Sequence, residues 1–394
     1  MDFTFTGEEQ AWRQEVHEFL ESEHPETFPC EELDEGYGFG GWSLAFTRRL
    51  GEKEWIGRTW PKEYGGQDRP LMELFILYDE IACYEAPAEA SCYSEFCGMH
   101  ITRYGSDELK RWLLPALARG EITLWEGLSE PNAGSDLLAL QTTAVEDGDY
   151  YIINGQKTWN SNGHRASHGY TAAKTDPEAP RHKGMSMFII DMKSPGITIR
   201  PIPDMAGGDA YTEVFFDNVR VPKGNLVGGK NEGFPLILGA LEGDRFWGRC
   251  MKASYKRRIL EEVVDYCRQT KGANGKPLAQ DPLVRHKLAD LAIEIEVCRL
   301  FSYRAIWKLN KGETLTYEAS VLKTFADEMG QRFTHTVMQI LGPYGQLERG
   351  SKWAPFDGEI ERGYLNSVGH TIAGGTSEIQ RSTIARFGLG LPTK

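Results

Sequence analysis

Hydrophobic residues in the first third of the chain recur at helical spacing. One apolar face is predicted for a first helix, formed by Trp12, Val16, Phe19 and Leu20. Thr6 and Glu9 stand at capping-box spacing, where hydroxyl and carboxylate each satisfy an unpaired backbone amide at the helix start. Further helices are predicted over 71–83 and 107–117, the second with Ser106 as its N-cap. This part of the chain is therefore predicted to be helical.

The pattern changes after residue 120. Four short β-type runs, punctuated by Gly, Pro, Asp and Asn, occupy 150–153, 186–190, 197–202 and 213–216. They predict an antiparallel β domain. From about Phe234 helical spacing returns, with a long segment over 317–341 that favours a helix bundle. The predicted fold class is α+β and multidomain, with a helical domain over 1–120, a β domain over 121–232 and a helical bundle over 233–394.

Charge and composition then exclude several classes of protein. The 394 residues carry a net charge of −13 without a Lys/Arg block, which argues against a nucleic-acid surface. No apolar run approaches the ~20 residues of a membrane span, and the acidic N-terminus does not look like a signal peptide. Seven cysteines without CxxC pairs are typical of reduced thiols. We expect a soluble, cytoplasmic protein.

Some apparent motifs carry little weight. Ser320 and Lys323 fit an SxxK pattern but lie in a helical segment without partner motifs. His164 and His168 are four residues apart, yet no Cys or carboxylate nearby completes a metal set, so no metal site is predicted. No GxGxxG opens a βαβ unit and no GxxxxGK[ST] occurs, so neither standard phosphate-binding loop is predicted.

Three polar stretches are better candidates: 128–136 (LSEPNAGSD), 159–163 (WNSNG) and 371–381 (TIAGGTSEIQR). Small polar residues with free amides suit a ligand rich in heteroatoms, and a Trp face suits an aromatic ring. The same residues also stabilise β-turns, and composition alone favours that simpler interpretation.

Taken together, these stretches resemble the acyl-CoA dehydrogenase family. The matching motifs come in the family's order over nearly the whole chain: YGSDELK from Tyr104, LSEPNAGSD, NGQKTW from Asn154, FDNVRVP from Phe216, QILG from Gln339, GTSEIQR from Gly375 and IAR from Ile384. The family fold, a helical domain, a β-barrel-like domain and a four-helix bundle, agrees with the pattern above. The resemblance implies non-covalent FAD and oxidation of an acyl-CoA thioester to its 2,3-enoyl form.

The resemblance also implies roles for individual residues. The expected cofactor-binding residues within one chain are Leu128, Ser129, Gly134, Ser135, Trp159, Ser161, Thr376 and Glu378. Arg268, Gln339 and Gly342 are expected to reach the FAD of a neighbouring subunit, although Lys271 and Pro343 depart from the family pattern nearby. The expected substrate-binding residues are Ser135, Arg245 and Arg386.

The catalytic base is the main departure from the family. Many members carry the base as a Glu directly before the Gly-Thr of the last motif, and here that position is Gly374. A second family arrangement places the base on a bundle helix directly before an arginine. In that register Asp244 becomes the candidate base and Arg245 the arginine, while Glu242 lies about 200° around the helix.

Gly374 retains a function in this prediction. Its backbone N–H remains available to polarise the thioester oxygen, and the missing side chain leaves room for a bulky, branched or ring-bearing acyl group. The sequence style resembles a bacterial subclass that acts on bulky and steroid side-chain CoA thioesters.

Partners and alternatives follow from the same resemblance. We expect a homotetramer or an α₂β₂ heterotetramer that passes electrons to an electron-transferring flavoprotein. Because Gly374 has lost the usual base and Asp244 is one methylene short, a non-catalytic subunit that completes FAD sites is the main alternative. A flavin oxidase that passes electrons to oxygen is a further alternative.

Overall fold

The computed structural model describes residues 4–30 and 40–392. Five helices come first: α1 (Gly7–Glu23), α2 (Leu44–Glu52), α3 (Leu71–Tyr84), α4 (Glu89–Tyr104) and α5 (Asp107–Ala118). Thr6 and Glu9 form the predicted capping box on α1, and the Ser106 hydroxyl accepts a hydrogen bond from the Leu109 amide at the start of α5. The helices predicted over 71–83 and 107–117 are confirmed to within one residue.

The central region is one eight-stranded sheet. Its strands are β1 (Leu124–Gly127), β2 (Thr143–Asp147), β3 (Tyr150–Ser161), β4 (His168–Lys174), β5 (Met185–Asp191), β6 (Ile197–Ile202), β7 (Tyr211–Pro222) and β8 (Leu226–Val227). They are ordered β6-β7-β3-β2-β4-β5-β8, with β1 paired to β4. All four predicted β runs fall inside strands.

The purely antiparallel prediction for this sheet is wrong in one respect. β1 runs parallel to β4, and β2 meets β4 through one parallel pair. Parallel neighbours need a long crossover, and the segment between β1 and β4 supplies one that contains β2 and β3. Local sequence patterns carry no information on such a distant pairing.

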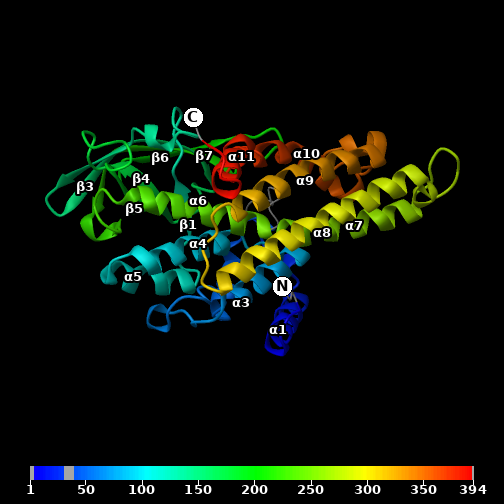
Figure 1. The fold of residues 1–394 in the computed structure, drawn as a ribbon, viewed down its shortest axis with the longest axis horizontal. Coiled ribbons are helices and arrows are strands. Elements are labelled where there is room, and N and C mark those ends of the chain that lie inside the picture. The colour runs from blue at the N-terminus through cyan, green and yellow to red at the C-terminus, as the bar shows by residue number, and fades with distance from the viewer. Residues whose placement is uncertain (1–3, 31–39, 393–394) are drawn as a thin grey trace.

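The rest of the chain is helical: α6 (Gly233–Cys250), α7 (Lys252–Gln269), α8 (Pro282–Asn310), α9 (Glu318–Leu341), α10 (Glu359–His370) and α11 (Ser377–Thr383). Figure 1 shows the long helices α6–α9 as a bundle, with the sheet at one end and the α7–α8 connection at the other. α10 and α11 pack on α9. The three-region fold class is confirmed, while the boundaries at 120/121 and 232/233 stay a prediction.

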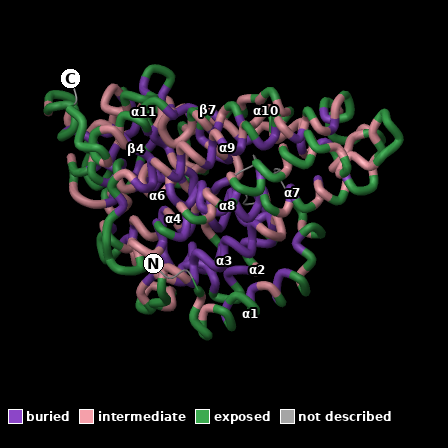
Figure 2. The backbone as a smooth tube through the Cα atoms, turned by 45° about the vertical axis from the view of Figure 1, so that its right-hand side comes forward, coloured by how far each residue is buried: buried purple, intermediate pink, exposed green. Residues whose placement is uncertain are grey.

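Two hydrophobic cores hold these elements. The larger core joins the N-terminal helices to the bundle, and the smaller one fills the sheet around Trp125, Phe188 and Val214. Figure 2 shows the buried segments concentrated where α3, α4 and α8 meet. Among the described residues, no helix is both long enough and apolar enough to cross a membrane. The seven cysteines are free thiols.

Candidate active site

The turn between α10 and α11 adopts a backbone that requires glycine. Gly374 and Gly375 have φ of +67° and +94°, in the left-handed region that side chains rarely tolerate. Thr376 then ends the turn as the N-cap of α11, where its hydroxyl accepts a hydrogen bond of 3.3 Å from the Ile379 amide. The adjacent glycines of the sequence are therefore explained by backbone geometry.

Asp244 on α6 lies directly against this turn. A Cβ built on Gly374 would collide with the Asp244 Oδ2 atom and would lie 3.2 Å from Arg249 Nη1. The Asp244 carboxylate thus fills the space in which a side chain at 374 would begin. Its side chain is 29% exposed, and Arg249 Nη1 donates to Oδ2 at 3.2 Å.

Two arginines of α6 hold the main chain of the turn. Arg245 Nε donates to the Gly374 carbonyl at 3.1 Å, and Gln380 Nε2 on α11 donates to the same oxygen at 3.1 Å. Arg249 Nη2 donates to the Ala373 carbonyl at 3.1 Å. In this structure the Arg245 side chain therefore binds the main chain of the turn, and Asp244, the preceding residue on α6, lies beside the same turn.

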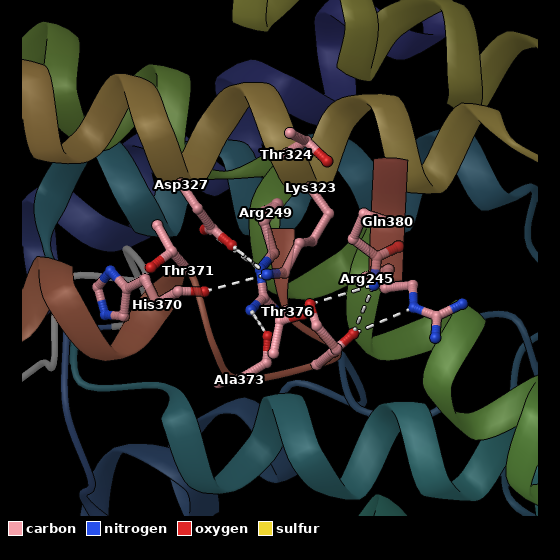
Figure 3. Close-up of polar contacts among 12 residues, drawn as sticks. Arg245, Arg249, Lys323, Thr324, Asp327, His370, Thr371, Ala373, Thr376 and Gln380 are labelled. Carbon is pink, nitrogen blue, oxygen red and sulfur yellow. Dashed lines mark hydrogen bonds and ion pairs between the residues drawn. The ribbon is translucent and has the colours of Figure 1, made fainter. Parts of the chain in front are cut away.

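A buried charge cluster anchors Arg249 from behind (Figure 3). Asp327 on α9 is fully buried and accepts from Arg249 Nε at 3.4 Å, from Lys252 Nζ at 2.5 Å and from Lys323 Nζ at 3.2 Å. Lys323 also donates to the His370 carbonyl at 3.2 Å, at the start of the turn. The cluster ties α6, α7 and α9 to the backbone beside Asp244.

The pKa values in this cluster follow burial and charge. Burial opposes ionisation of Asp327, but its three cationic neighbours hold the pKa of this carboxyl well below its ordinary value. Burial lowers the pKa of Lys323 to about 8, against the attraction of Asp327. Burial, and then the charge of Lys252, lowers the pKa of His370, which is therefore neutral at pH 7.

Sequence reasoning did not single out a second carboxyl group near Asp244. Glu126 on β1 has its pKa raised to about 8, first by burial and then by the charge of Asp244. An acidic residue within the apolar run 124–128 was the available signal for it. The sequence analysis did not single out Arg249 or Asp327 either. For Arg249, a charged residue inside the apolar segment 246–251 was a comparable signal.

The loop 128–136 and strand β3 meet at the predicted flavin edge. The Thr158 amide donates to the Ser129 carbonyl at 3.0 Å, and Lys157 Nζ donates to the Leu128 carbonyl at 3.2 Å. This arrangement brings Leu128 and Ser129 close to the β3 segment that carries Trp159 and Ser161. Gly134 and Ser135 lie on the exposed part of the loop.

Trp159 combines an exposed indole with an unusual backbone conformation. Its indole is 61% exposed, and its φ is +63°, which is strained for a bulky side chain. Its ring centre lies 6.1 Å from that of Tyr211, whose hydroxyl faces Gly369 near the end of α10. Tyr211 therefore lies between the end of α10 and the segment of β3 that carries Trp159.

A cavity of about 450 Å³ opens beside α11 and α9. Thr376, Ser377, Glu378 and Arg381 line it, together with five residues of α9 and of the 371–372 segment. The Ser377 hydroxyl oxygen is buried without a hydrogen-bond partner among the described residues. The hydroxyl side chains and the unsatisfied Ser377 hydroxyl at this cavity, and the exposed indole of Trp159 outside its lining, are groups whose chemistry fits a flavin nucleotide.

The remaining predicted residues lie elsewhere. Arg268 is exposed near the end of α7 and pairs with Asp265, while Gln339 and Gly342 lie at the end of α9. Lys287 Nζ donates to the Gln339 side-chain oxygen at 2.7 Å, which links the start of α8 to that end of the bundle. Figure 1 shows this end far from α11. Within one chain, these three residues are not brought together with Asp244.

Arg386 is exposed on the last helical turn. Its guanidinium carbon lies 4.9 Å from the ring centre of Phe387. Among the described residues no group of His, Cys, Asp and Glu side chains has metal-binding geometry.

Comparisons with known proteins agree with the three-region fold. Family models match three consecutive segments: the acyl-CoA dehydrogenase N-terminal domain over residues 6–121, the middle domain over 126–219 and the C-terminal domain over 231–389. The acyl-CoA dehydrogenase FadE26 of Mycobacterium tuberculosis is 33% identical over 404 residues, covering 100% of this chain and 99% of that protein.

Solved structures are similar over their full length. The Tcur3481-Tcur3483 steroid ACAD superposes with a TM-score of 0.88 at 30% identity, covering 100% of both chains. The ChsE4-ChsE5 complex from Mycobacterium tuberculosis superposes with a TM-score of 0.86, also at 30% identity and 100% coverage of both chains. Members of this family are flavoprotein oxidoreductases that typically bind FAD. The chain belongs to the acyl-CoA dehydrogenase family.

Proposed function

We propose that this chain dehydrogenates a bulky, branched or cyclic acyl-CoA thioester to its 2,3-enoyl form, with Asp244 as the base. Bound FAD would accept the hydride that leaves the β-carbon. Leu128, Ser129, Trp159, Ser161 and Thr376 would hold the flavin, with Gly134, Ser135 and Glu378 at its periphery. Ser135 and Arg386 would contact the CoA part of the substrate.

The position of Asp244 is the observation that carries the proposal. Its Oδ2 atom occupies the space next to Gly374, which is the family's other base position. A carboxylate delivered from α6 therefore reaches the region that a Glu side chain at 374 would enter. The shorter Asp is compensated by this close approach, because a glycine lets α6 and the turn come together. Asp244 would take the α-proton as the β-hydride leaves.

The turn would stabilise the charge that develops on the thioester oxygen. The Gly374 N–H is a donor on a backbone whose carbonyl is fixed by Arg245 and Gln380. A preorganised donor of this kind stabilises an enolate-like oxygen without reorganisation during the reaction. Arg245 would thereby act on the substrate through the backbone that it holds.

The bulky acyl group is inferred from volume and from the relatives. Gly374 contributes no side chain, and Asp244 approaches from the helix instead. One similar structure is described as a steroid ACAD, at 30% identity over the full chain. A straight-chain thioester that is turned over faster than every cyclic one would contradict this part of the proposal.

Assembly into a tetramer would complete the flavin site. Tyr364, Val368 and Ile372 are 37%, 45% and 61% exposed at four-residue spacing along α10 and the turn after it. Such an apolar stripe is typical of a subunit interface. A second copy or a related subunit would bring its Arg268, Gln339 and Gly342 to the flavin, and an electron-transferring flavoprotein would accept the electrons.

Asp244→Asn tests the assignment of the base. The variant is isosteric, so FAD is expected to stay bound with an unchanged visible spectrum. Anaerobic stopped-flow should show flavin reduction by a cyclic acyl-CoA slowed by about 10²–10⁴-fold, the usual contribution of a general base.

Glu242→Gln on the same helix is the matched control and should reduce at the wild-type rate. An Asp244→Asn enzyme that bleaches as fast as the wild type would remove Asp244 from the mechanism. A chain that is colourless when expressed alone, and that gains FAD only with a related subunit, would instead support the non-catalytic alternative. Peroxide release under air would indicate an oxidase.

A further inference from the structure

Four polar side chains, two buried and two half-buried, form a group beside Asp244 that we call the Glu126 cluster: Cys97 and His100 on α4, Glu126 on β1 and Tyr170 on β4. Glu126 and Tyr170 are direct partners in the β1–β4 pairing, so their side chains share one face of the sheet. Cys97 and His100 are three residues apart on α4 and therefore share a helix face.

Two contacts show that these faces meet. The Cys97 sulfur lies 4.0 Å from a Glu126 carboxyl oxygen. The ring centres of His100 and Tyr170 are 6.3 Å apart. The sheet and α4 thus enclose the cluster from two sides.

Two of its polar atoms have no partner. Tyr170 is fully buried, and its hydroxyl makes no hydrogen bond to any described residue. The Nδ1 atom of His100 is buried and unpartnered in the same way. Buried hydroxyl and imidazole groups are nearly always paired, because leaving them unpaired is unfavourable. Both atoms therefore point to a ligand group that the protein does not supply.

Helix α6 borders the third side of the cluster. α6 presents Gly239 and Gly243 there, one turn apart and directly before Asp244. A Cβ on either glycine would have only His100 Nε2 within 4 Å, at 3.7 Å and 3.9 Å. The helix that carries the candidate base therefore contacts the cluster at His100, and neither glycine adds a side chain there.

The cluster is polar but uncharged at neutral pH. Burial, and then the charge of Asp244, raises the pKa of Glu126 to about 8, so this carboxyl keeps its proton. Burial raises the pKa of Tyr170 and lowers that of His100 to about 4. Two O–H donors and a neutral imidazole suit a neutral oxygen. A carboxylate ligand would be repelled by Asp244.

We propose that Glu126, Tyr170 and His100 form a subsite that binds a hydroxyl or ketone oxygen carried by the acyl group. The substrate class is then an oxygenated, bulky acyl-CoA thioester. This inference rests on the proposed function, because it takes the acyl group to lie beside Asp244.

Matched substrates test the subsite. The FAD-loaded enzyme is assayed with pairs of cyclic acyl-CoA thioesters that differ only by a ring hydroxyl or ketone. A site built to hydrogen-bond an oxygen rejects the analogue that lacks it, so kcat/KM should favour at least one oxygenated member by tenfold or more. Tyr170→Phe and Glu126→Met should each lower this ratio about tenfold, and Glu126→Gln, which keeps a donor, should lower it less.

Tyr151→Phe is the matched control, since this buried tyrosine lies in the separate core of the sheet and should leave the ratio unchanged. Calorimetric titration of the same thioester pairs gives a binding ratio that does not depend on turnover. Dehydrogenation without any preference for oxygen, unaltered in Tyr170→Phe, would overturn the subsite and leave the proposed function intact. Preferential binding without dehydrogenation of any thioester would overturn the proposed function and leave the subsite.

Discussion

At the scale of single residues, Gly374 and Asp244 depend on each other. The glycine is required twice, by its φ of +67° and by the carboxylate that fills the space of its missing side chain. Asp244 in turn depends on Gly374, because any side chain at 374 would displace its carboxylate. A carboxylate base at position 374 and a carboxylate at position 244 would occupy the same space. Moving the base from one position to the other therefore requires substitutions at both residues.

Gly374→Ala tests this dependence. The added methyl group would displace Asp244 or Arg249, and a misplacement of about 1 Å can cost about 10² in rate. We expect flavin reduction to slow by about that factor in stopped-flow. Gly350→Ala is the control, because Gly350 has a φ of +85° with open space around it and so carries the backbone strain alone. Equal rates for the two variants would contradict the steric argument.

Glu95 on α4 gives a prediction for pH dependence. Its side chain is fully buried, one carboxyl oxygen accepts from the Gly57 amide at 2.5 Å and the other has no partner among the described residues. Burial raises its pKa from 4.5 to about 8. Between these values the unfolded chain has lost the proton that the folded chain keeps, so stability falls as pH rises.

Glu95→Gln removes the titrating carboxyl group, so the number of protons bound at this position no longer differs between the folded and unfolded chain. From pH 5 to pH 8 the free energy of unfolding of the wild type should fall more steeply than that of Glu95→Gln, by up to about 1.4 kcal/mol per pH unit. Urea unfolding at several pH values measures both curves. Parallel curves would show that Glu95 is ionised in the folded protein.

At the scale of elements, the turn before α11 is held mainly by cations that reach its carbonyl oxygens. Arg249 and Lys323 donate to the carbonyls of Ala373 and His370, and both are anchored on Asp327 of α9. The position of the turn therefore depends on one buried carboxylate more than on the side chains within the turn.

Asp327→Asn should destabilise the protein strongly. It removes the carboxylate charge that Arg249, Lys252 and Lys323 share, although Arg249 keeps Asp244 as a second partner. Breaking a buried pair in this way costs about 3–5 kcal/mol. Glu328→Gln, at the next residue, removes a more exposed pair with Arg381 and should cost at most about 1 kcal/mol. Denaturant unfolding compares the two variants. Similar losses would mean that the cluster contributes no more than a surface pair.

Local elements were predictable because their signals are local. Caps such as Thr6 and Ser106, together with apolar periodicity, located α1 and α5 closely. The parallel pairing of β1 with β4 was not predictable, since no turn joins these strands. The site divides in the same way. The family register placed Asp244, but Arg249 and Asp327 meet across 78 residues, and Glu126 contacts Cys97 across 29. Apolar neighbours in the sequence indicate that a charged residue is buried. They do not indicate its partner, which lies far away in the sequence.

At the scale of the whole molecule, the predicted site is divided between the two ends of the bundle. In Figure 1, α6 and α11 lie where the bundle meets the sheet, and they carry Asp244 and the N-cap Thr376. The last turns of α7 and α9 lie toward the α7–α8 connection, and they carry Arg268, Gln339 and the C-cap Gly342. If the flavin contacts both groups, they come from different chains. In the proposed tetramer, the exposed stripe on α10 would be the contact through which a second subunit brings the other group.

This separation has a genetic consequence. In a homo-oligomer, a chain with Asp244→Asn and a chain with Arg268→Ala would each be defective alone, and neither repairs its own defect. In a hybrid pair, one site would take its base from one chain and its arginine from the other, and so be intact. Hybrids isolated with two affinity tags should recover about half of the wild-type activity per pair. Two inactive alleles would then complement each other within a single gene, and hybrids without activity would show that each chain builds its site alone.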